Sequence, residues 1–506
     1  MWQLPLMLNV LAADTPLAAP QPFLHPFLIV AIGIAVVLTL ILRWRVNAFI
    51  ALITAALVVS FLAPAPPTHD DPTKQETWVS RVAKEFGTSC EKIGLVIGFA
   101  AVIGEAMMKS RAADRIVVAF LKLLGAKRAS WALMSSGFVL AIPVFFDTVF
   151  YLLIPLANSL YRTTRKNFLL YICAIAAGGA VTHTLVPPTP GPAAMAANLG
   201  VSLGLMICVG LMVAAPSAAV AMLVAAYLNR NVQISKLPEL EDESKIDSAA
   251  VALREQETMQ VPLFEAILPV LLPVVLITAD TVVSAMIPKV SAPAADATVA
   301  ATSTIWTTLK PFTASFGDPD LALLISMALA VITWMRLRKP SFKDVAEACE
   351  TALLSGGLII LITAAGGSFG AMLKETNVAG VIKESFANQA ASGLLALTLG
   401  FGLAVVLKVA QGSSTTAMIV VSSMMAAMGL SEDKLGFNPV YLATAIGGGS
   451  LVGSWMNDSG FWIFARMSGL TDTEALKTWS PLLVVLGMTS FTLTVVYAMV
   501  LPLKGW

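Results

Sequence analysis

Two short segments rich in proline, glycine and polar side chains interrupt long apolar stretches of this sequence. The first runs from Pro187 to Pro192 and the second from Asn457 to Gly460. A lipid bilayer cannot hydrogen-bond the backbone groups that such breaks release, so they must be buried in protein or line a wet cavity. Paired interruptions in two halves of a chain indicate the binding centre of a secondary transporter. We therefore expect these segments to bind a small solute.

Two further apolar stretches, 129–160 and 391–430, each carry a polar cluster at their centre. The clusters run from Phe145 to Thr148 and from Gln411 to Thr416, and each stretch could form two helices or one re-entrant hairpin. Basic residues flank the first stretch on both sides, which places its ends in the cytoplasm. Mixed charges flank the second, as is typical of an outer side. We expect two hairpins, the first opening inward and the second outward.

These four polar segments supply groups that suit a hydroxylated carboxylate. Backbone N–H groups at helix N-termini attract negative charge, and hydroxyl and amide side chains can bind substrate hydroxyls. Lys408 could offset a carboxylate charge, although its side chain could instead extend to an interface. Ser and Thr hydroxyls can also bond to the preceding helical turn. The residues expected to bind substrate are Thr148, Thr189, Gly191, Lys408, Gln411, Gly412, Ser413, Ser414, Thr415, Asn457 and Ser459.

Three ionisable residues within apolar stretches are candidates for carrying a coupled proton. An ionisable group inside a bilayer is costly unless it is paired or solvated, so each one indicates function. Asp458 lies within a break and is the first candidate, with a structural helix cap as its alternative. Asp147 lies at a hairpin tip and is the second. His183 could relay protons or serve as a hydrogen-bonded structural histidine.

The composition restricts the chain to membrane proteins. Hydrophobic residues make up 57% of the 506 residues and charged residues only 12%, about half the share usual in soluble proteins. The formal net charge of +1 suggests no nucleic-acid partner. No zinc-protease motif is recognised and no metal or cofactor is expected. The four cysteines fall in different compartments of the predicted topology, so disulfides are not expected.

Apolar runs and flanking charges predict a polytopic all-α protein. About ten spanning helices and two re-entrant hairpins are expected, or 14 segments if hairpin legs are counted. Residues 1–22 form an exposed tail, 228–261 a cytoplasmic loop, and both termini lie outside. The expected spans lie near 25–42, 47–63, 91–109, 167–200, 201–227, 262–287, 319–336, 351–373, 438–466 and 478–503.

An internal repeat relates the two halves, 23–227 and 262–506. Gly104 aligns with Gly370, an offset of 266 positions that also places the tip residue Asp147 on Ser413 without a gap. The first repeat contains hairpin 129–160 and a broken helix over 167–200, and the second contains hairpin 391–430 and a broken helix over 438–466. Because one copy begins outside and the other inside, the repeats are inverted, as in many transporters.

Four strings in order resemble the gluconate permease family. They are Phe145 to Asp147, Val186 to Pro192, Val409 to Thr415 and Asn457 to Trp462. The resemblance implies import of a gluconate-like sugar acid with protons across the inner (cytoplasmic) membrane, and a fold of the ion-transporter superfamily. It also implies a scaffold domain, an elevator-like transport domain with both hairpins and both broken helices, and a homodimer. Thr189 and Trp455 stand where the family pattern has histidine, which affects the choice of substrate.

Three other functions are compatible with parts of the sequence. Sodium coupling in place of protons is the main alternative. An intramembrane hydrolase is suggested by Gly366 to Gly370, which match Gly-x-Ser-x-Gly, but that motif works on a strand-turn-helix elbow and here lies in an apolar helix. A channel is the third. We therefore expect a transporter and no enzymatic activity.

Overall fold

The computed structural model describes residues 24–63, 76–235, 258–287, 305–376, 393–456 and 458–505. The expected N-terminal tail, most of the 228–261 loop and Asn457 lie outside this part of the chain. The described residues are all-helical apart from turns, which confirms the all-α prediction. Seven of these helices are long and apolar enough to cross a bilayer, and six apolar helices are shorter.

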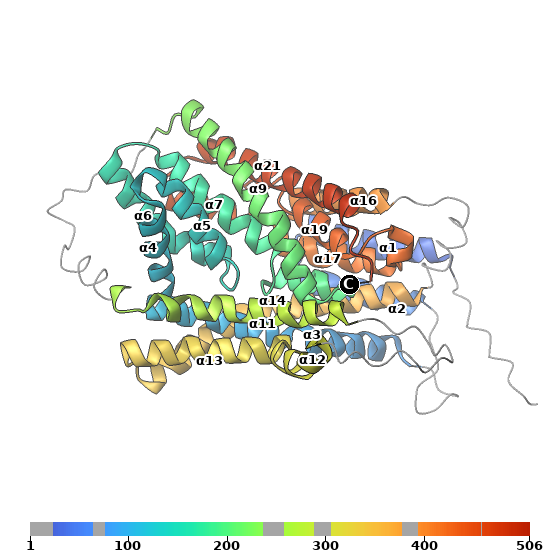
Figure 1. The fold of residues 1–506 in the computed structure, drawn as a ribbon. Helices are drawn as coiled ribbons and strands as arrows, with labels where there is room; N and C mark the ends of the chain where they lie inside the picture. The colour runs from blue at the N-terminus through green and yellow to red at the C-terminus, as the bar shows by residue number, and fades with distance from the viewer. Residues whose placement is uncertain are drawn as a thin grey trace, which may run out of the picture.

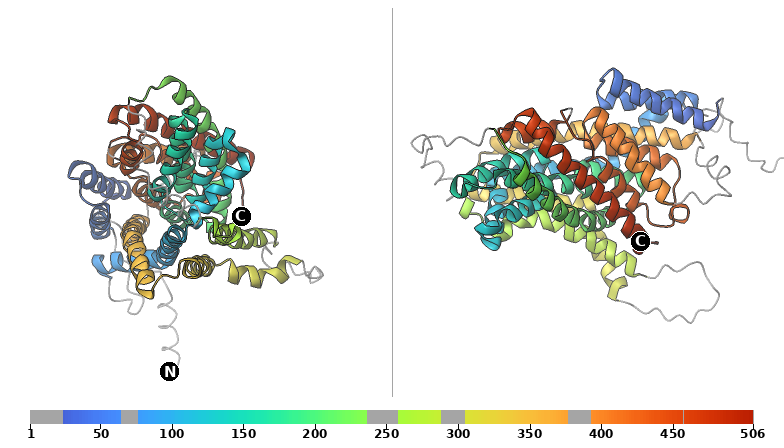
Figure 2. Two further views of the ribbon diagram at one scale, coloured as in Figure 1. Left: turned by 90° about the vertical axis from the view of Figure 1, so that its left-hand side faces the viewer. Right: turned by 90° about the horizontal axis from the view of Figure 1, so that it is seen from above.

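Long helices form one side of the molecule. In Figure 1, α3 (Trp78–Ser110), α11 (Leu263–Met286), α13 (Pro319–Arg338) and α14 (Phe342–Glu375) run side by side along the lower part. The α14 helix packs on α3 and also on α2 (Ala48–Leu62). Figure 2 shows α1 (Pro26–Leu38) and α2 at the edge of the molecule. The short helix α12 (Ile305–Phe316) packs on α11.

An ion pair fastens these long helices together. The Arg81 guanidinium, only 1% exposed, pairs with Glu375, and also donates to the Ser60 carbonyl oxygen at 3.2 Å. The three residues belong to α3, α14 and α2. A buried charge needs such partners, so Arg81 holds these three helices in one register.

The remaining helices contain two hairpins and two interrupted helices. In the first half, α5 (Ala129–Leu140) and α6 (Phe146–Thr164) are joined by a turn, and α7 (Phe168–Leu185) is separated from α8 (Pro190–Leu199). In the second half, α16 (Gly393–Gln411) and α17 (Ser414–Ala427) are joined by a turn, and α19 (Val440–Gly449) is separated from α20 (Ser459–Met467). The other elements here are α4 (Ala112–Leu124), α9 (Leu203–Asn231), α18 (Glu432–Leu435) and α21 (Asp472–Val500).

Local residue chemistry sets the positions of these breaks. Prolines follow the end of α7, and Pro190 starts α8 with a fixed φ suited to a first helical position. Gly412 ends α16 with φ +87°, a backbone conformation that favours glycine. Ser413 then caps α17, because its hydroxyl accepts a hydrogen bond from the Thr416 N–H at 3.2 Å.

Each hairpin packs tightly on an interrupted helix. A Cβ atom on Gly178 of α7 would collide with the Met134 carbonyl oxygen of α5, and one on Gly449 of α19 would collide with the Phe401 carbonyl oxygen of α16. Nearly every residue of α7 and α19 is buried. The hairpins and interrupted helices therefore form a closely packed unit, and their polar ends come together inside it.

Candidate functional site

The polar ends of the hairpins and interrupted helices surround one cavity of about 620 Å³. The first tip, the second tip and the break before α20 all contribute to it. A face of α14 also lines the cavity, with further residues from α7 and α21 and with Leu451, just after the end of α19. The lining residues used below are Asp147, Thr148, His183, Gly412, Ser413, Ser414, Thr415, Asp458, Ser459, Ser355, Leu358, Ile359, Ile362 and Trp479.

The first tip is open to a ligand. The α6 helix begins at Phe146, and its N-cap residue Phe145 has no side chain able to cap the first turn. The first N–H groups of a helix lack intrahelical partners and form a ready site for anions. Asp147 and Thr148, half-buried in this first turn, line the cavity and make no hydrogen bond or ion pair to a described residue.

The second tip is largely satisfied by its own contacts. Besides the Ser413 cap, the Thr416 hydroxyl lies 3.0 Å from the Ser413 hydroxyl. The Ser414 hydroxyl donates to the Ser450 carbonyl oxygen at 2.8 Å, which ties the tip to the end of α19. Thr415 faces the cavity and, within the described ranges, has no such partner. Ser459, the first residue of α20, also lines the cavity and makes no side-chain hydrogen bond to a described residue. Of the hydroxyls expected to bind substrate, those of Thr148, Thr415 and Ser459 are therefore available.

Lys408 lies behind the second tip, outside the cavity lining. Its side chain is 2% exposed, and its Nζ atom lies 2.7 Å from Asp458 Oδ2 and 2.6 Å from the Gly412 carbonyl oxygen. The structure thus pairs Lys408 with Asp458, two residues that the sequence analysis assigned separately to substrate binding and proton coupling. This pair joins the hairpin tip to the break.

Asp458 is bonded on several sides. It is the N-cap residue of α20, and its Oδ1 atom accepts from the Gly460 N–H at 3.0 Å. The Ser454 hydroxyl donates to Asp458 Oδ2, and Trp479 Nε1–H donates to the same Ser454 hydroxyl at 2.6 Å. Asp458 therefore acts as a helix cap as well as an ion-pair partner. Its other contacts leave only an edge of the residue, 8% exposed, at the cavity.

His183 lies in the last turn of α7 and lines the cavity beside the first tip. Its ring meets the Phe145 ring edge-on, with centroids 6.1 Å apart. The Nδ1 atom is buried and has no hydrogen-bond partner among the described residues. The bonded structural role considered for His183 is thus not seen at this nitrogen.

Two predicted residues lie in the first break but not at the cavity. Thr189 is 2% exposed and donates to the carbonyl oxygens of His183, at 3.0 Å, and Val186, at 2.6 Å. Gly191 packs so closely on the Met418 side chain that a Cβ atom would collide with it. Both residues shape the backbone between α7 and α8. The side chain of Gln411 and all of Asn457 fall outside the described residues.

The α14 wall was missed in the sequence analysis. Ser355, Leu358, Ile359 and Ile362 recur at spacings of three and four, so they share one face of a helix. In an apolar span such a face cannot be distinguished from one that faces lipid. The only available signal was Ser355 itself, a polar residue followed by two glycines.

The hydrolase motif is buried in helix packing. Ser368 is 0% exposed, and its hydroxyl donates to the carbonyl oxygens of Ala364, at 3.1 Å, and Val82, at 3.3 Å. Cβ atoms on the neighbouring Gly367 and Gly366 would collide with Ser89 and Ile419. The motif joins α14 to α3 and α17 and presents no nucleophile to a substrate.

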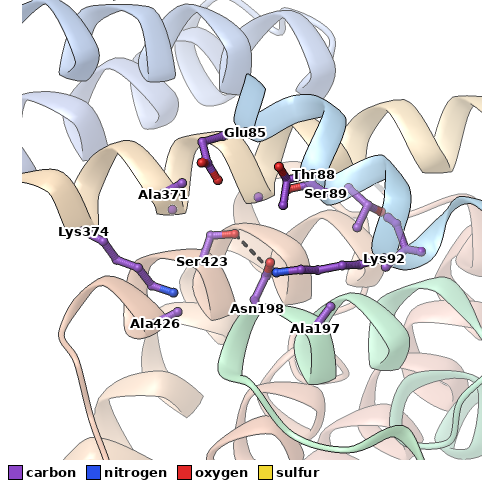
Figure 3. Close-up of a pocket in the computed structure, with 14 residues that line it drawn as sticks. Glu85, Thr88, Ser89, Lys92, Ala197, Asn198, Ala371, Lys374, Ser423 and Ala426 are labelled. Carbon is purple, nitrogen blue, oxygen red and sulfur yellow. Dashed lines mark hydrogen bonds between the residues drawn. The ribbon is translucent and has the colours of Figure 1, made fainter. Parts of the chain in front are cut away.

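A second, smaller cavity of about 80 Å³ lies between α3, α14, α8 and α17. Figure 3 shows Lys92 and Lys374 reaching towards Asn198 and Ser423 from opposite sides. The Asn198 amide donates to the hydroxyls of Ser422, at 2.9 Å, and Ser423, at 3.0 Å. Neither hairpin tip nor the second break lines this cavity. It is a small polar cavity between packed helices, separate from the larger cavity at the tips.

Several helices long and apolar enough to cross a membrane, together with a cavity lined by helix ends from both halves of the chain, are the features of a multi-pass membrane transporter. The family model described as "GntP family permease" matches residues 25–500, and the chain belongs to this family. The resemblance seen in the four sequence strings is thereby confirmed.

Relatives of this chain are named as permeases. An "Uncharacterized permease" of Haemophilus influenzae is 32% identical, over 90% of this chain and 88% of the relative. A "Gluconate permease" of Bacillus licheniformis is 29% identical, over 94% of this chain and 99% of the relative. Among solved structures, the YdaH transporter of Alcanivorax borkumensis has a similar fold, with a TM-score of 0.57 and 15% identity, over 95% of this chain and 99% of that one.

Proposed function

We propose that this permease imports a gluconate-like sugar acid, or a related small hydroxycarboxylate, together with protons. The observation that carries the proposal is the combination of an uncapped helix N-terminus and three available hydroxyls around one cavity. The names of the family and of the Bacillus licheniformis relative support the same class of substrate.

The substrate carboxylate would bind at the first tip. The N–H groups of the first turn of α6 and the Thr148 hydroxyl are the available donors there. Thr415 and Ser459, from the second tip and the second break, would bind the sugar hydroxyls. Gln411 and Asn457 remain predicted ligands of the same substrate.

Of the two aspartates, Asp147 and not Asp458 would carry the proton. It faces the cavity without a partner among the described residues, whereas Asp458 is paired with Lys408 and caps α20. An ionised Asp147 would repel a substrate carboxylate bound to the same helical turn, so substrate binding favours the protonated carboxyl. This repulsion couples the proton to the anion. His183, close to the tip, would pass protons to Asp147.

The architecture would operate as an elevator built from two inverted repeats, 23–227 and 262–506. The packed unit of hairpins and interrupted helices would move as the transport domain, and α14 would belong to the scaffold that it moves against. Dimerisation would hold such a scaffold fixed in the inner membrane. Both termini would lie outside, as the positive-inside rule indicates.

Orientation can be tested with single cysteines in a cysteine-free background. Ser80, in the first turn of α3, and Lys343, in the first turn of α14, are both exposed. A cysteine at Ser80 should react with an impermeant thiol reagent added to intact cells, and one at Lys343 should react only after permeabilisation. The reverse labelling would invert the proposed topology.

The function is tested by uptake into proteoliposomes with the membrane potential held at zero. Radiolabelled gluconate should accumulate when the exterior is acidic, and a sodium gradient should add little. Unlabelled gluconate-like acids, lactate, glycerate and D-serine, offered as competitors, would define the substrate. If uptake requires sodium and ignores the pH gradient, coupling is to sodium; if no acid competes or accumulates, the substrate class is wrong.

A further inference from the structure

Lys408 is the one lysine whose described side chain is almost fully buried, and its environment is made of oxygen atoms. Its Nζ atom contacts the Gly412 carbonyl oxygen at the end of α16 and the Asp458 carboxylate. The ammonium lies 2.6 Å and 2.7 Å from these atoms, so both contacts are charge-assisted hydrogen bonds.

These oxygens are of the types that bind a hard cation. Carboxylate and carbonyl oxygens are the preferred ligands of such ions, and the C-terminal end of a helix carries partial negative charge. In transporters with interrupted helices, unwound carbonyls and half-helix C-termini coordinate sodium ions. Here the position at the end of α16 is filled by the protein's own ammonium group.

The equivalent described positions in the first half carry no such pair. At the offset of 266 positions, Lys408 corresponds to Ile142 and Asp458 to Pro192. Ile142 is 4% exposed and apolar, and Pro192 is buried in the first turn of α8. A buried charge pair confined to one half indicates a role specific to the second tip.

We propose that the Lys408 ammonium is a built-in replacement for a monovalent metal cation, holding the second hairpin tip against the break before α20. This deepens the proposed function, on which it rests, because it explains how the second tip is neutralised without a sodium ion. Removing the ammonium leaves the Gly412 carbonyl oxygen and the Asp458 carboxylate facing an empty space. Sodium from solution should occupy that space.

Two substitutions separate loss of charge from the creation of space. Lys408→Ala removes the ammonium and the stem, so a hydrated sodium ion can enter. Lys408→Met also removes the charge but retains a side chain of similar length that fills the space. A third variant, Lys408→Ala with Asp458→Asn, keeps the space but removes the carboxylate that would bind the ion.

The first measurement is thermal stability of the purified variants in sodium and in choline, which requires no substrate. Saturating sodium should raise the Tm of Lys408→Ala by roughly 2 °C or more, because an ion that binds only the folded state stabilises it. Sodium should not alter the Tm of the unmodified protein, Lys408→Met or the double variant. Equal responses of Lys408→Ala and Lys408→Met would overturn the proposal.

The second measurement is gluconate uptake under the same pH gradient. Lys408→Ala should take up gluconate about tenfold more slowly than the unmodified protein in choline and recover in sodium, as expected for loss of a charge-assisted bond. Lys408→Met should stay slow in both. If Lys408→Ala can be purified in neither cation, the proposal is also wrong, since sodium should rescue folding. Absence of gluconate uptake by the unmodified protein would reject only the substrate, because the Tm response is read independently.

Discussion

The two hairpin tips meet at the same cavity but differ in what their polar groups do. At the first tip the helix N-terminus is uncapped, and Asp147 and Thr148 face the cavity without described partners. At the second tip Ser413 caps the helix, Ser414 binds α19, and Lys408 connects the tip to Asp458. The comparison suggests a division of roles: the first tip is free to titrate and bind, while the second is held in a fixed shape.

The largest expected effect is that of Asp147→Asn, which removes the proposed proton carrier without breaking a hydrogen bond to a described residue. Accumulation driven by a pH gradient should be abolished, while exchange of internal for external gluconate should continue because no net proton transfer is needed. Uptake and counterflow in the same proteoliposomes check this result. Accumulation equal to that of the unmodified protein would show that Asp147 does not carry the proton.

Asp458→Asn should act mainly on stability. It leaves the Lys408 ammonium buried without a carboxylate, and breaking a buried pair from one side costs roughly 3–5 kcal/mol. The variant should therefore unfold at a lower temperature and reach the membrane in smaller amounts, whereas Asp147→Asn should not. Thermal unfolding and membrane abundance of the two variants give a direct test. Equal stability would remove the distinction between the two tips.

These two aspartates show what sequence reasoning can and cannot determine. Both stood out because a polar residue within an apolar stretch is costly, and the structure places both at the cavity. The sequence does not show that Asp458 is paired and Asp147 is not. Lys408 and Asp458 are 50 positions apart, and only the folded hairpin brings them together. Pairings of this kind depend on tertiary packing that spacing along the chain does not show.

The positions of other site residues also depend on tertiary packing that the sequence does not show. Thr189 looked like a ligand because it lies in a break, yet its hydroxyl closes the end of α7. Ile359 could not be distinguished by sequence from a lipid-facing residue, yet it lines the cavity. Proline, glycine and serine patterns located the breaks and caps well, because those effects are local. Which face of a helix lines the site is set by tertiary packing, not by local sequence.

Substrate affinity should respond moderately to the available hydroxyls. Thr148→Val and Thr415→Val each remove one hydrogen bond worth about 0.5–1.5 kcal/mol, so the KM for gluconate should rise roughly two- to tenfold. Thr189→Val is the matched control, because its hydroxyl lies outside the cavity lining and bonds to backbone carbonyl oxygens at the end of α7. An unchanged KM in both cavity variants would indicate that substrate binds elsewhere.

The smallest expected effect on transport is that of Ser413→Ala, which removes the cap of α17 and acts through stability. Loss of such a cap costs about 1 kcal/mol of stability. Phe145→Ser at the first tip should have the opposite effect. A serine at this N-cap position should stabilise α6, and its hydroxyl should compete with substrate for the N–H groups of the first turn. Unfolding measurements and gluconate KM values for both variants check this. A higher KM for gluconate in Ser413→Ala than in Phe145→Ser would reverse the roles assigned to the two tips.

The most direct test of proton-coupled transport through this site is to follow the pH inside proteoliposomes while gluconate is added outside. With the potential held at zero and no sodium present, gluconate should acidify the interior of vesicles containing the unmodified protein, since each anion brings a proton inward. Vesicles containing Asp147→Asn should show no acidification under the same gluconate gradient. Gluconate entry without a change in internal pH, in the unmodified protein, would contradict proton coupling.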